Sequence, residues 1–369
     1  MLFASVCFPA FAETEEGETL QGSTFEIYTV EDLYEFASIV NSGNRYLSAR
    51  VMNDIVVNEN VLDAEGNPTS DTFRVWTPIK NDYSGVFDGN GHVISGLYIP
   101  NGRDQWSMFI SIHGGTIKNL GVEDSYYSNS QGRSGGICGQ TWTNSVITNC
   151  YFKGVIKCGG SEVGGITSAC HNGSVVSNCF SMAKLSGASA IHGICPVVSK
   201  ATVENCYYLE DDFSSEVAYA DSFSVLSMTT EQFADGEVCY KLNKGVTDGT
   251  QVFFQNLDEP REDTLRVIDL HPVFNTAHLT VYANDTIYYN YLNSAVENLL
   301  DESGAVVYVE DYTIVVSGAK GYLYLSDMNG NVLFATQKRE ETSCVRIPVS
   351  KAGVYVVVVD GASCKVLVR

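Results

Sequence analysis

Four segments of this chain recur at nearly constant spacing, and this repeat limits the possible folds more than any other feature. The first marker begins at Ser107, Gly135, Gly164 and His192, at intervals of 28, 29 and 28 residues. A second marker contains Asn119, Asn149, Asn178 and Asn205, at intervals of 30, 29 and 27 residues. Two independent markers that keep one period indicate a structural repeat.

The repeat units contain short β-branched and aromatic runs separated by Gly, Ser and Asn, without helical periodicity. A unit of 27 to 30 residues made of short strands cannot bury its own apolar face. Stacking solves this, because each strand then pairs with its copies above and below. The sequence therefore predicts an all-β protein, built as a right-handed parallel β-helix.

The four repeated asparagines are expected to form a structural ladder at a corner of each turn. Apolar residues lie two positions before and one position after each Asn. On a straight strand this odd separation would put them on opposite faces, so only a bend at the Asn places both in the core. Asn tolerates the left-handed conformation of a tight corner, and stacked Asn side chains can hydrogen-bond along the axis. Gly96 fits the same frame one turn earlier, and Asp54 fits a more degenerate turn before it. Four unrelated loop asparagines are the alternative.

The chain has eleven cysteines, and five of those in the repeats follow the same frame. Cys150, Cys179 and Cys206 share one core position, and Cys138 and Cys195 share another. Adjacent strands in a stack are about 4.8 Å apart, and in-line stacking is a poor geometry for a disulfide. We therefore expect buried thiols that act as small apolar side chains.

Several motifs resemble the GLUG-motif proteins, a group of bacterial surface proteins, over residues 27 to 281. The segment from Phe87 to Ile99 is similar to the opening signature of that family, and Trp76 to Ile79 to the element before it. The Asn-Cys-Tyr sequences at Asn149 and Asn205 are similar to its repeat ending. Ser107 and His192 depart from the motif, where Gly would be usual, so the outer repeats are expected to be distorted.

This resemblance implies an exported β-helix, often from gut Bacteroidetes, with adhesive or carbohydrate-linked roles. It transfers no catalytic residues to this chain. The segments from Thr229 to Phe233 and from Cys239 to Asn243 are similar to a short helix that follows the last repeat of the family.

Two short helices are predicted to cap the stack. Thr29 and Asp32 form a capping pattern before an apolar stripe of Leu33, Phe36, Ala37 and Val40. Thr229 and Gln232 form the second capping pattern. Such elements cover exposed strand edges and prevent end-to-end aggregation.

The strand pattern changes near residue 306 to alternating strands joined by tight turns. Asn329-Gly330 and Asp360-Gly361 are hairpin signals, so a small antiparallel β-sandwich is expected. The end of the chain is similar to C-terminal sorting domains of type IX secretion. The predicted domains are a signal-peptide remnant (1–12), the β-helix (13–281), a linker (282–305) and the sandwich (306–369).

The first twelve residues form an apolar run that ends in Ala10-Phe11-Ala12, which has the form of a signal peptidase site. A buried N-terminal strand is the alternative. The net charge of −22 argues against DNA, RNA or an anionic membrane surface as partner. No apolar run approaches the roughly 18 residues that span a bilayer. We expect a secreted or outer-surface protein and no integral membrane protein.

The repeats contain few groups that could perform catalysis. Residues 107–208 hold four carboxylates and six basic side chains. Glycoside hydrolysis needs paired carboxylates, and Glu123-Asp124, the one acidic pair, is predicted to be solvated. His92 is predicted to be a turn residue. His113, His171 and His192 are expected at different positions of the turns, and the cysteine spacings match no zinc site. The sequence predicts no catalytic residues, metal or cofactor.

Aromatic residues of the repeats are the candidate binding residues, because rings on a rigid ladder suit sugar or protein contacts. The alternative for each ring is packing inward or under the N-terminal segment. The sequence therefore favours a binding or adhesion protein, whose partner is a glycan or a host or bacterial surface protein. A polysaccharide lyase or glycoside hydrolase of the β-helix type is the alternative function. The candidate rings are Tyr126, Tyr127, Trp142, Tyr151, Tyr207 and Tyr208.

Overall fold

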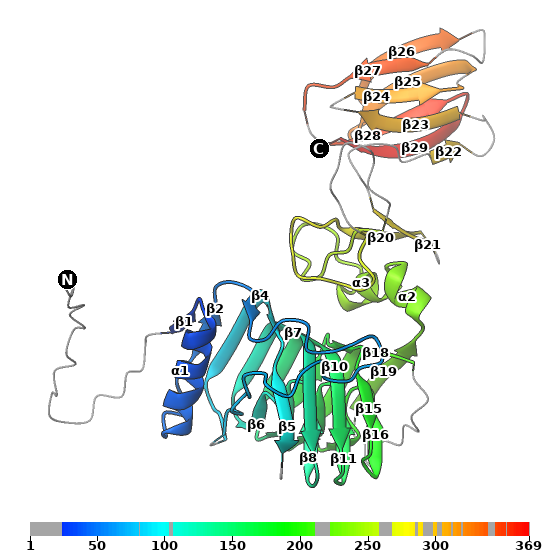
Figure 1. The fold of residues 1–369 in the computed structure, drawn as a ribbon. Helices are drawn as coiled ribbons and strands as arrows, with labels where there is room; N and C mark the ends of the chain where they lie inside the picture. The colour runs from blue at the N-terminus through cyan, green and yellow to red at the C-terminus, as the bar shows by residue number, and fades with distance from the viewer. Residues whose placement is uncertain are drawn as a thin grey trace, which may run out of the picture.

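The structure is a computed structural model in which parallel strands stack into a solenoid of about four turns (Figure 1). Small antiparallel sheets follow toward the C-terminus. The residues expected to be a signal-peptide remnant lie outside the described part of the chain. The structure describes residues 24–80, 82–102, 106–210, 222–257, 268–284, 287–290, 298–300, 305–310, 313–318, 320–338, 344–351 and 353–368.

The solenoid is made of three sheets whose strands pair in parallel, which confirms the predicted parallel β-helix. The largest sheet holds β1 (Phe25–Ile27), β2 (Ala49–Val51), β3 (Ile55–Val56), β4 (Val86–Ser95), β5 (Tyr98–Gly102), β7 (Thr116–Asn129), β10 (Val146–Cys158), β13 (Val175–Ser177), β14 (Phe180–Ser181), β15 (Lys184–Ser186), β18 (Thr202–Leu209) and β19 (Ser222–Met228). The second holds β6 (Phe109–His113), β9 (Cys138–Trp142), β12 (Thr167–His171) and β17 (Val197–Ser199). The third holds β8 (Arg133–Gly135), β11 (Glu162–Gly164) and β16 (Ala190–His192).

The repeated positions of the sequence pair with one another across the turns. Ile117 lies beside Ile147, Ile147 beside Val176, and Val176 beside Val203, and all four side chains are buried. Stacking equivalent apolar residues in this way gives one continuous core along the solenoid.

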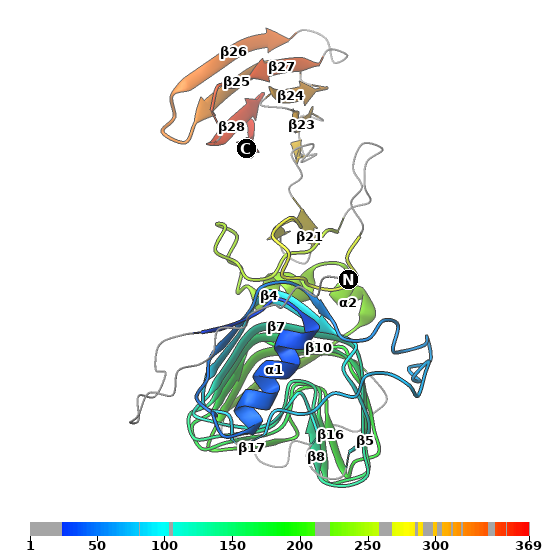
Figure 2. The same cartoon turned by 60° about the vertical axis from the view of Figure 1, so that its left-hand side comes forward.

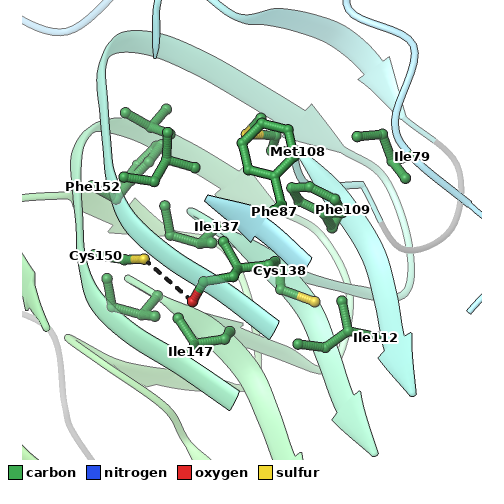
Figure 3. Packing of buried hydrophobic residues seen from close by; sticks show 14 of the residues in the cluster. Ile79, Phe87, Met108, Phe109, Ile112, Ile137, Cys138, Ile147, Cys150 and Phe152 are labelled. Atoms are coloured by element: carbon green, nitrogen blue, oxygen red, sulfur yellow. Dashed lines mark hydrogen bonds between the residues drawn. The ribbon is translucent and has the colours of Figure 1, made fainter. Parts of the chain in front are cut away.

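The cysteines of the repeats contribute small side chains to this core. Cys138 and Cys150 pack among the aliphatic and aromatic residues drawn in Figure 3. Cys150, Cys179 and Cys206 are buried with free thiols, as predicted. Burial raises the pKa of Cys179 and of Cys206 well above the usual range of a thiol, which disfavours the reactive thiolate.

The four repeated asparagines stack in one column at a corner of the turns. Each has a left-handed backbone conformation, with φ between 48° and 52°. Each side chain after the first donates a hydrogen bond from Nδ2 to Oδ1 of the Asn one turn earlier, at 3.0, 3.2 and 2.9 Å. The column is closed at one end by the Asp88 carboxylate, which accepts from Asn119, and at the other by the Tyr207 hydroxyl, which donates to Asn205.

Three details of the predicted frame are wrong. Gly96 is not in the asparagine column, because Ser95 pairs with Glu123 and Gly96 therefore lies beside Asp124. A register irregularity between Asp88 and His92 leaves Asn119 without a paired residue on β4, and the carboxylate of Asp88, which pairs with Lys118, accepts from Asn119 instead. Ile55 likewise pairs with Ile94, which removes Asp54 from the column. In the first turn, the repeat aligns Ser107 with Gly135 and therefore predicts that Phe109 pairs with Ile137. In the structure Phe109 pairs with Cys138, one residue further along.

Helix α1 (Val30–Asn41) closes the N-terminal end of the stack, across which it lies in Figure 2. Thr29 and Asp32 form the predicted capping box. The predicted apolar stripe, Leu33, Phe36, Ala37 and Val40, is buried against the core.

A second helical element follows the last parallel strand, β19. Thr229 and Gln232 form the other predicted capping box, at the start of α2 (Thr230–Ala234), and α3 (Glu237–Leu242) follows. These helices share a separate apolar cluster with the outer side chains of β10, β14 and β18 and with Val252, Phe253, Leu257, Phe274 and Val281. We call the described residues between 229 and 290 the cap. Its hairpin, β20 (Val281–Asn284) and β21 (Ile287–Asn290), occupies part of the stretch predicted to be a linker.

The C-terminal residues form two antiparallel four-stranded sheets around their own core, which confirms the predicted sandwich. Asn329-Gly330 and Asp360-Gly361 join hairpins, as expected. The sandwich begins before the predicted residue 306, because β22 pairs with β23. One sheet holds β22 (Asn298–Leu300), β23 (Ala305–Glu310), β24 (Thr313–Ser317) and β27 (Val345–Pro348), and the other β26 (Val332–Lys338), β25 (Gly321–Asp327), β28 (Gly353–Val359) and β29 (Ala362–Val368).

No helix in the described ranges is long and apolar enough to cross a membrane.

Candidate functional site

The structure buries most of the rings that were predicted to line an outer face. Tyr127 and Tyr151 are each 1% exposed, Tyr126 is 8% exposed and Tyr207 is 7% exposed. Trp142 and Tyr208 are partly buried. The predicted exposed aromatic face is therefore wrong, and the alternative of inward or covered packing holds for these four tyrosines.

Tyr127 is part of the solenoid core, whereas Tyr151 and Tyr126 are covered from outside. Tyr151 lies outside the solenoid core but stacks on Phe180 at 4.6 Å between ring centroids and contacts Phe274 of the cap. Tyr126 stacks on Tyr98 in a small cluster that includes Phe73. The cap and the loop of residues 57–79 thus occupy the surfaces on which a ligand was expected to bind.

Trp142 belongs to a short column of rings on the second sheet. It stacks on His171 with a centroid distance of 4.2 Å, and His113 lies on its other side at 6.0 Å. The prediction that His113 and His171 occupy different positions is therefore wrong: both align with Trp142 in successive turns. The indole separates the two imidazoles, so this column does not bring two histidine ligands together.

The candidate site is a pocket on the largest sheet, with a volume of about 360 Å³. We call it the β7–β10 pocket. Its walls come from strands β7, β10 and β15 and from the loop that contains Leu62 and Gly66. The lining residues are Leu62, Asp63, Gly66, Glu123, Asp124, Lys153, Gly154, Val155, Met182 and Lys184.

A β-bulge shapes this pocket. Glu123 pairs with Lys153, but the next pair is Ser125 with Gly154, so Asp124 is an extra residue on β7. Asp124 has a left-handed conformation, with φ of 45°. A side chain at Gly154 would lie 2.5 Å from the Ser125 carbonyl oxygen, so the close approach of the strands requires glycine there. A bulge re-aims neighbouring side chains, and here it flanks Glu123 and Lys153.

The carboxylate of Asp124 fixes the loop that forms one wall. Its two oxygens accept hydrogen bonds from the backbone N–H groups of Val61 and Leu62, at 2.8 and 2.9 Å. Lys184 donates to the Ala64 carbonyl at 3.1 Å from the other side. The acidic pair predicted to be solvated is therefore a structural part of the pocket.

Two pairs of polar groups, joined where His271 Nε2 lies 3.9 Å from Glu123 Oε1, connect the pocket with the cap. The buried Tyr151 hydroxyl donates to Glu123 Oε1 at 2.6 Å, and Lys153 Nζ lies 3.2 Å from Nε2 of His271. His271 Nδ1 lies 2.9 Å from the Pro272 carbonyl and donates to it, so Nε2 accepts from the lysine. Burial, and then the charge of Lys153, lowers the pKa of His271. The imidazole is therefore neutral at neutral pH.

The repeat itself contained a signal for part of this site. Glu123 and Lys153 each follow their ladder asparagine by four residues, so one period places them side by side. His271 lies outside the repeat, 118 residues from Lys153. The repeat therefore could not predict that His271 lies beside Lys153.

In the part of the chain that the structure describes, no three His, Cys, Asp or Glu side chains form a group that could hold a metal ion.

No protein-family model matches this chain, and none of the curated proteins compared with it matches. Among solved structures, it is similar to a crystal structure from Bacteroides ovatus described as a candidate immunoglobulin A1 protease. The two are 17% identical with a TM-score of 0.33, and the match covers 64% of this chain and 93% of the other. A likeness this distant carries no argument about function. The resemblances to GLUG-motif proteins and to sorting domains stay predictions from the sequence.

Proposed function

We propose that this chain is an exported binding or adhesion protein, secreted or held at the outer cell surface, whose ligand is a glycan or a host or bacterial surface protein. The observation that supports this most is the β7–β10 pocket. It combines an apolar patch from Leu62, Val155 and Met182 with charged side chains of both signs. A preformed concave site with a few convergent polar groups is typical of ligand binding.

The rigidity of the pocket supports the same proposal. Glu123 and Lys153 project from strands that pair on both sides within the stack, and Asp124 holds the loop wall through two hydrogen bonds. A site built on such elements needs little ordering when the ligand binds, which reduces the entropy cost of association.

A glycan array and a set of surface proteins, probed with the full chain, test this function. Hits are then titrated with the wild type, with Lys184→Glu in the pocket, and with Lys80→Glu, a matched charge reversal at an exposed lysine outside it. We expect at least one hit whose binding Lys184→Glu weakens and Lys80→Glu does not. If nothing binds, the proposed function is overturned.

One observation favours the alternative, a β-helix enzyme that cleaves polysaccharides. The neutral His271 accepts from Lys153 beside Glu123, and imidazole, amine and carboxyl groups are the usual proton-transfer groups of such reactions. Polysaccharides incubated with the protein would then give new reducing ends on hydrolysis, or ultraviolet-absorbing unsaturated sugars on elimination. Product formation that is lost in Lys153→Ala would favour the enzyme, and its absence across the glycans that bind would favour the binding protein.

For the C-terminal sandwich we propose the export role that its resemblance to type IX sorting domains implies. The separate apolar core of the sandwich supports this, because it marks a unit distinct from the solenoid and the cap. Deletion from residue 298 onward, in a bacterium with this secretion system, should leave the protein inside the cell envelope. Normal surface delivery of the shortened chain would rule the export role out.

A further inference from the structure

We infer that the β7–β10 pocket takes an uncharged sugar residue, whose adjacent hydroxyl groups bridge the ammonium groups of Lys153 and Lys184 and the carboxylate of Glu123. This inference rests on the proposed function and names its ligand class. It follows from the charges of the pocket, from its unused hydrogen-bonding capacity and from its apolar patch.

The charge of the pocket disfavours an acidic ligand. Three carboxylates line it, those of Asp63, Glu123 and Asp124, against two ammonium groups. His271, behind Lys153, adds no positive charge at neutral pH because its pKa is lowered. A uronate or sulfate group would therefore enter a pocket with an excess of negative charge, on a chain whose net charge is −22.

The unused hydrogen-bonding groups are of both kinds. An ammonium has three donors, and in the described part of the chain Lys153 donates to His271 and Lys184 to Ala64. Neither lysine forms an ion pair with a described carboxylate. Glu123 accepts a hydrogen bond from the Tyr151 hydroxyl at Oε1, so Oε2 can still accept one from a ligand.

A hydroxyl group both donates and accepts, so neighbouring hydroxyls on a sugar ring can accept from a lysine and donate to Glu123 at the same time. A carboxylate group can accept from the lysines, but it has no proton to donate to Glu123. The C–H face of the ring would pack on the apolar patch of Leu62, Val155 and Met182. An uncharged sugar thus matches all three properties of the pocket.

The test compares oligomers of galactose and of galacturonate with the same linkage, whose residues differ only in carrying CH₂OH or a carboxylate on C5, together with an acidic peptide. Each is titrated against the full chain by calorimetry at low and at high salt. We expect the neutral oligomer to bind more tightly, with an affinity that changes less than about twofold with salt, because no net charge is neutralised.

Pocket variants then assign the contacts. Lys184 is exposed, so its replacement should leave the fold intact, which a thermal melt checks. Lys184→Met removes a charged donor and should weaken binding about tenfold or more, whereas Lys184→Gln keeps a donor and should lose less. Lys80→Met, outside the pocket, should bind like the wild type.

The outcomes separate the two proposals. Tighter binding of the galacturonate oligomer or of the acidic peptide would overturn the neutral-sugar inference while leaving a binding function. Neutral-sugar binding that Lys184→Met does not change would also overturn it, because the ligand would then lie elsewhere. If neither sugar nor peptide binds but the arrays give a charged or non-sugar ligand, only the inference fails. If nothing binds in any assay, both fail.

Discussion

The asparagine ladder makes a quantitative prediction at Asn178. Its side chain donates to Asn149 at 3.2 Å and accepts from Asn205 at 2.9 Å, so Asn178→Ala removes two hydrogen bonds from a partly buried column. At about 0.5–1.5 kcal/mol each, these bonds account for about 1–3 kcal/mol of the free energy of unfolding. Residue 178 also has φ of 52°, which alanine adopts at a further cost of about 1 kcal/mol. The expected total for Asn178→Ala is about 2–4 kcal/mol.

Two further variants separate these contributions. Asn178→Gly removes the same hydrogen bonds but tolerates the left-handed backbone, so it should be about 1 kcal/mol more stable than Asn178→Ala. Asn172→Ala is the matched control, because Asn172 also has φ of 52° but is exposed and outside the column. Asn172→Ala should lower the free energy of unfolding only by the cost of holding alanine in the left-handed conformation, about 1 kcal/mol.

Urea unfolding followed by far-ultraviolet circular dichroism measures these differences. The predicted order of stability is wild type, then Asn172→Ala, Asn178→Gly and Asn178→Ala. If Asn178→Ala costs no more than Asn172→Ala, the ladder does not stabilise the solenoid and the reasoning is wrong.

Two other predictions concern groups inside the solenoid. The thiols of Cys150, Cys179 and Cys206 should react slowly with a thiol reagent in the native protein and rapidly in urea, because all three are buried; mass spectrometry that found a disulfide among them would contradict this. Burial lowers the pKa of His192 to about 4, and its Nδ1 accepts from the N–H groups of Ile194 and Cys195, so folding favours the neutral ring. Because the ring is protonated near pH 6.5 in the unfolded chain but only near pH 4 in the folded protein, its burial stabilises the folded state fully above about pH 6.5. This contribution, roughly 3 kcal/mol of the free energy of unfolding, should be lost as the pH falls from about 6.5 to 4. His192→Gly, which restores the residue found at Gly164, should lose less stability over this pH range in urea titrations, and an equal loss would exclude the role of His192.

The features that the sequence predicted well are those that one repeat unit determines. The asparagine column, the buried cysteines and the parallel strands follow from the period, because every turn presents the same residue types at the same position. The capping boxes at Thr29 and Thr229 were predictable for a similar reason: four consecutive residues contain the complete hydrogen-bonding pattern.

The wrong predictions fall where segments outside the repeat cover it. Tyr151, Phe180 and Tyr207 point away from the solenoid core, as outer rings should, but the cap packs on them. The sequence of the cap has no periodicity that relates it to these strands. Gly96 was misplaced for a different reason, since the irregularity between Asp88 and His92 changes the frame within one turn. A period finds equivalent positions only while the number of residues per turn is regular.

A second irregularity, the bulge at Asp124, accompanies the pocket in this part of the stack. Gly96 and Asp124 occupy equivalent positions on successive turns, and both have left-handed backbones. The next strand, β10, lacks this residue, because Lys153 pairs with Glu123 and Gly154 with Ser125. The solenoid thus passes from bulged to regular turns between β7 and β10. A bulge re-aims the side chains beside it, and the pocket lies at this step, beside Glu123 and Lys153. Insertion of one residue between Lys153 and Gly154 would continue the bulge, and we expect it to close the pocket while leaving the ladder of Asn119, Asn149 and Asn178 in register.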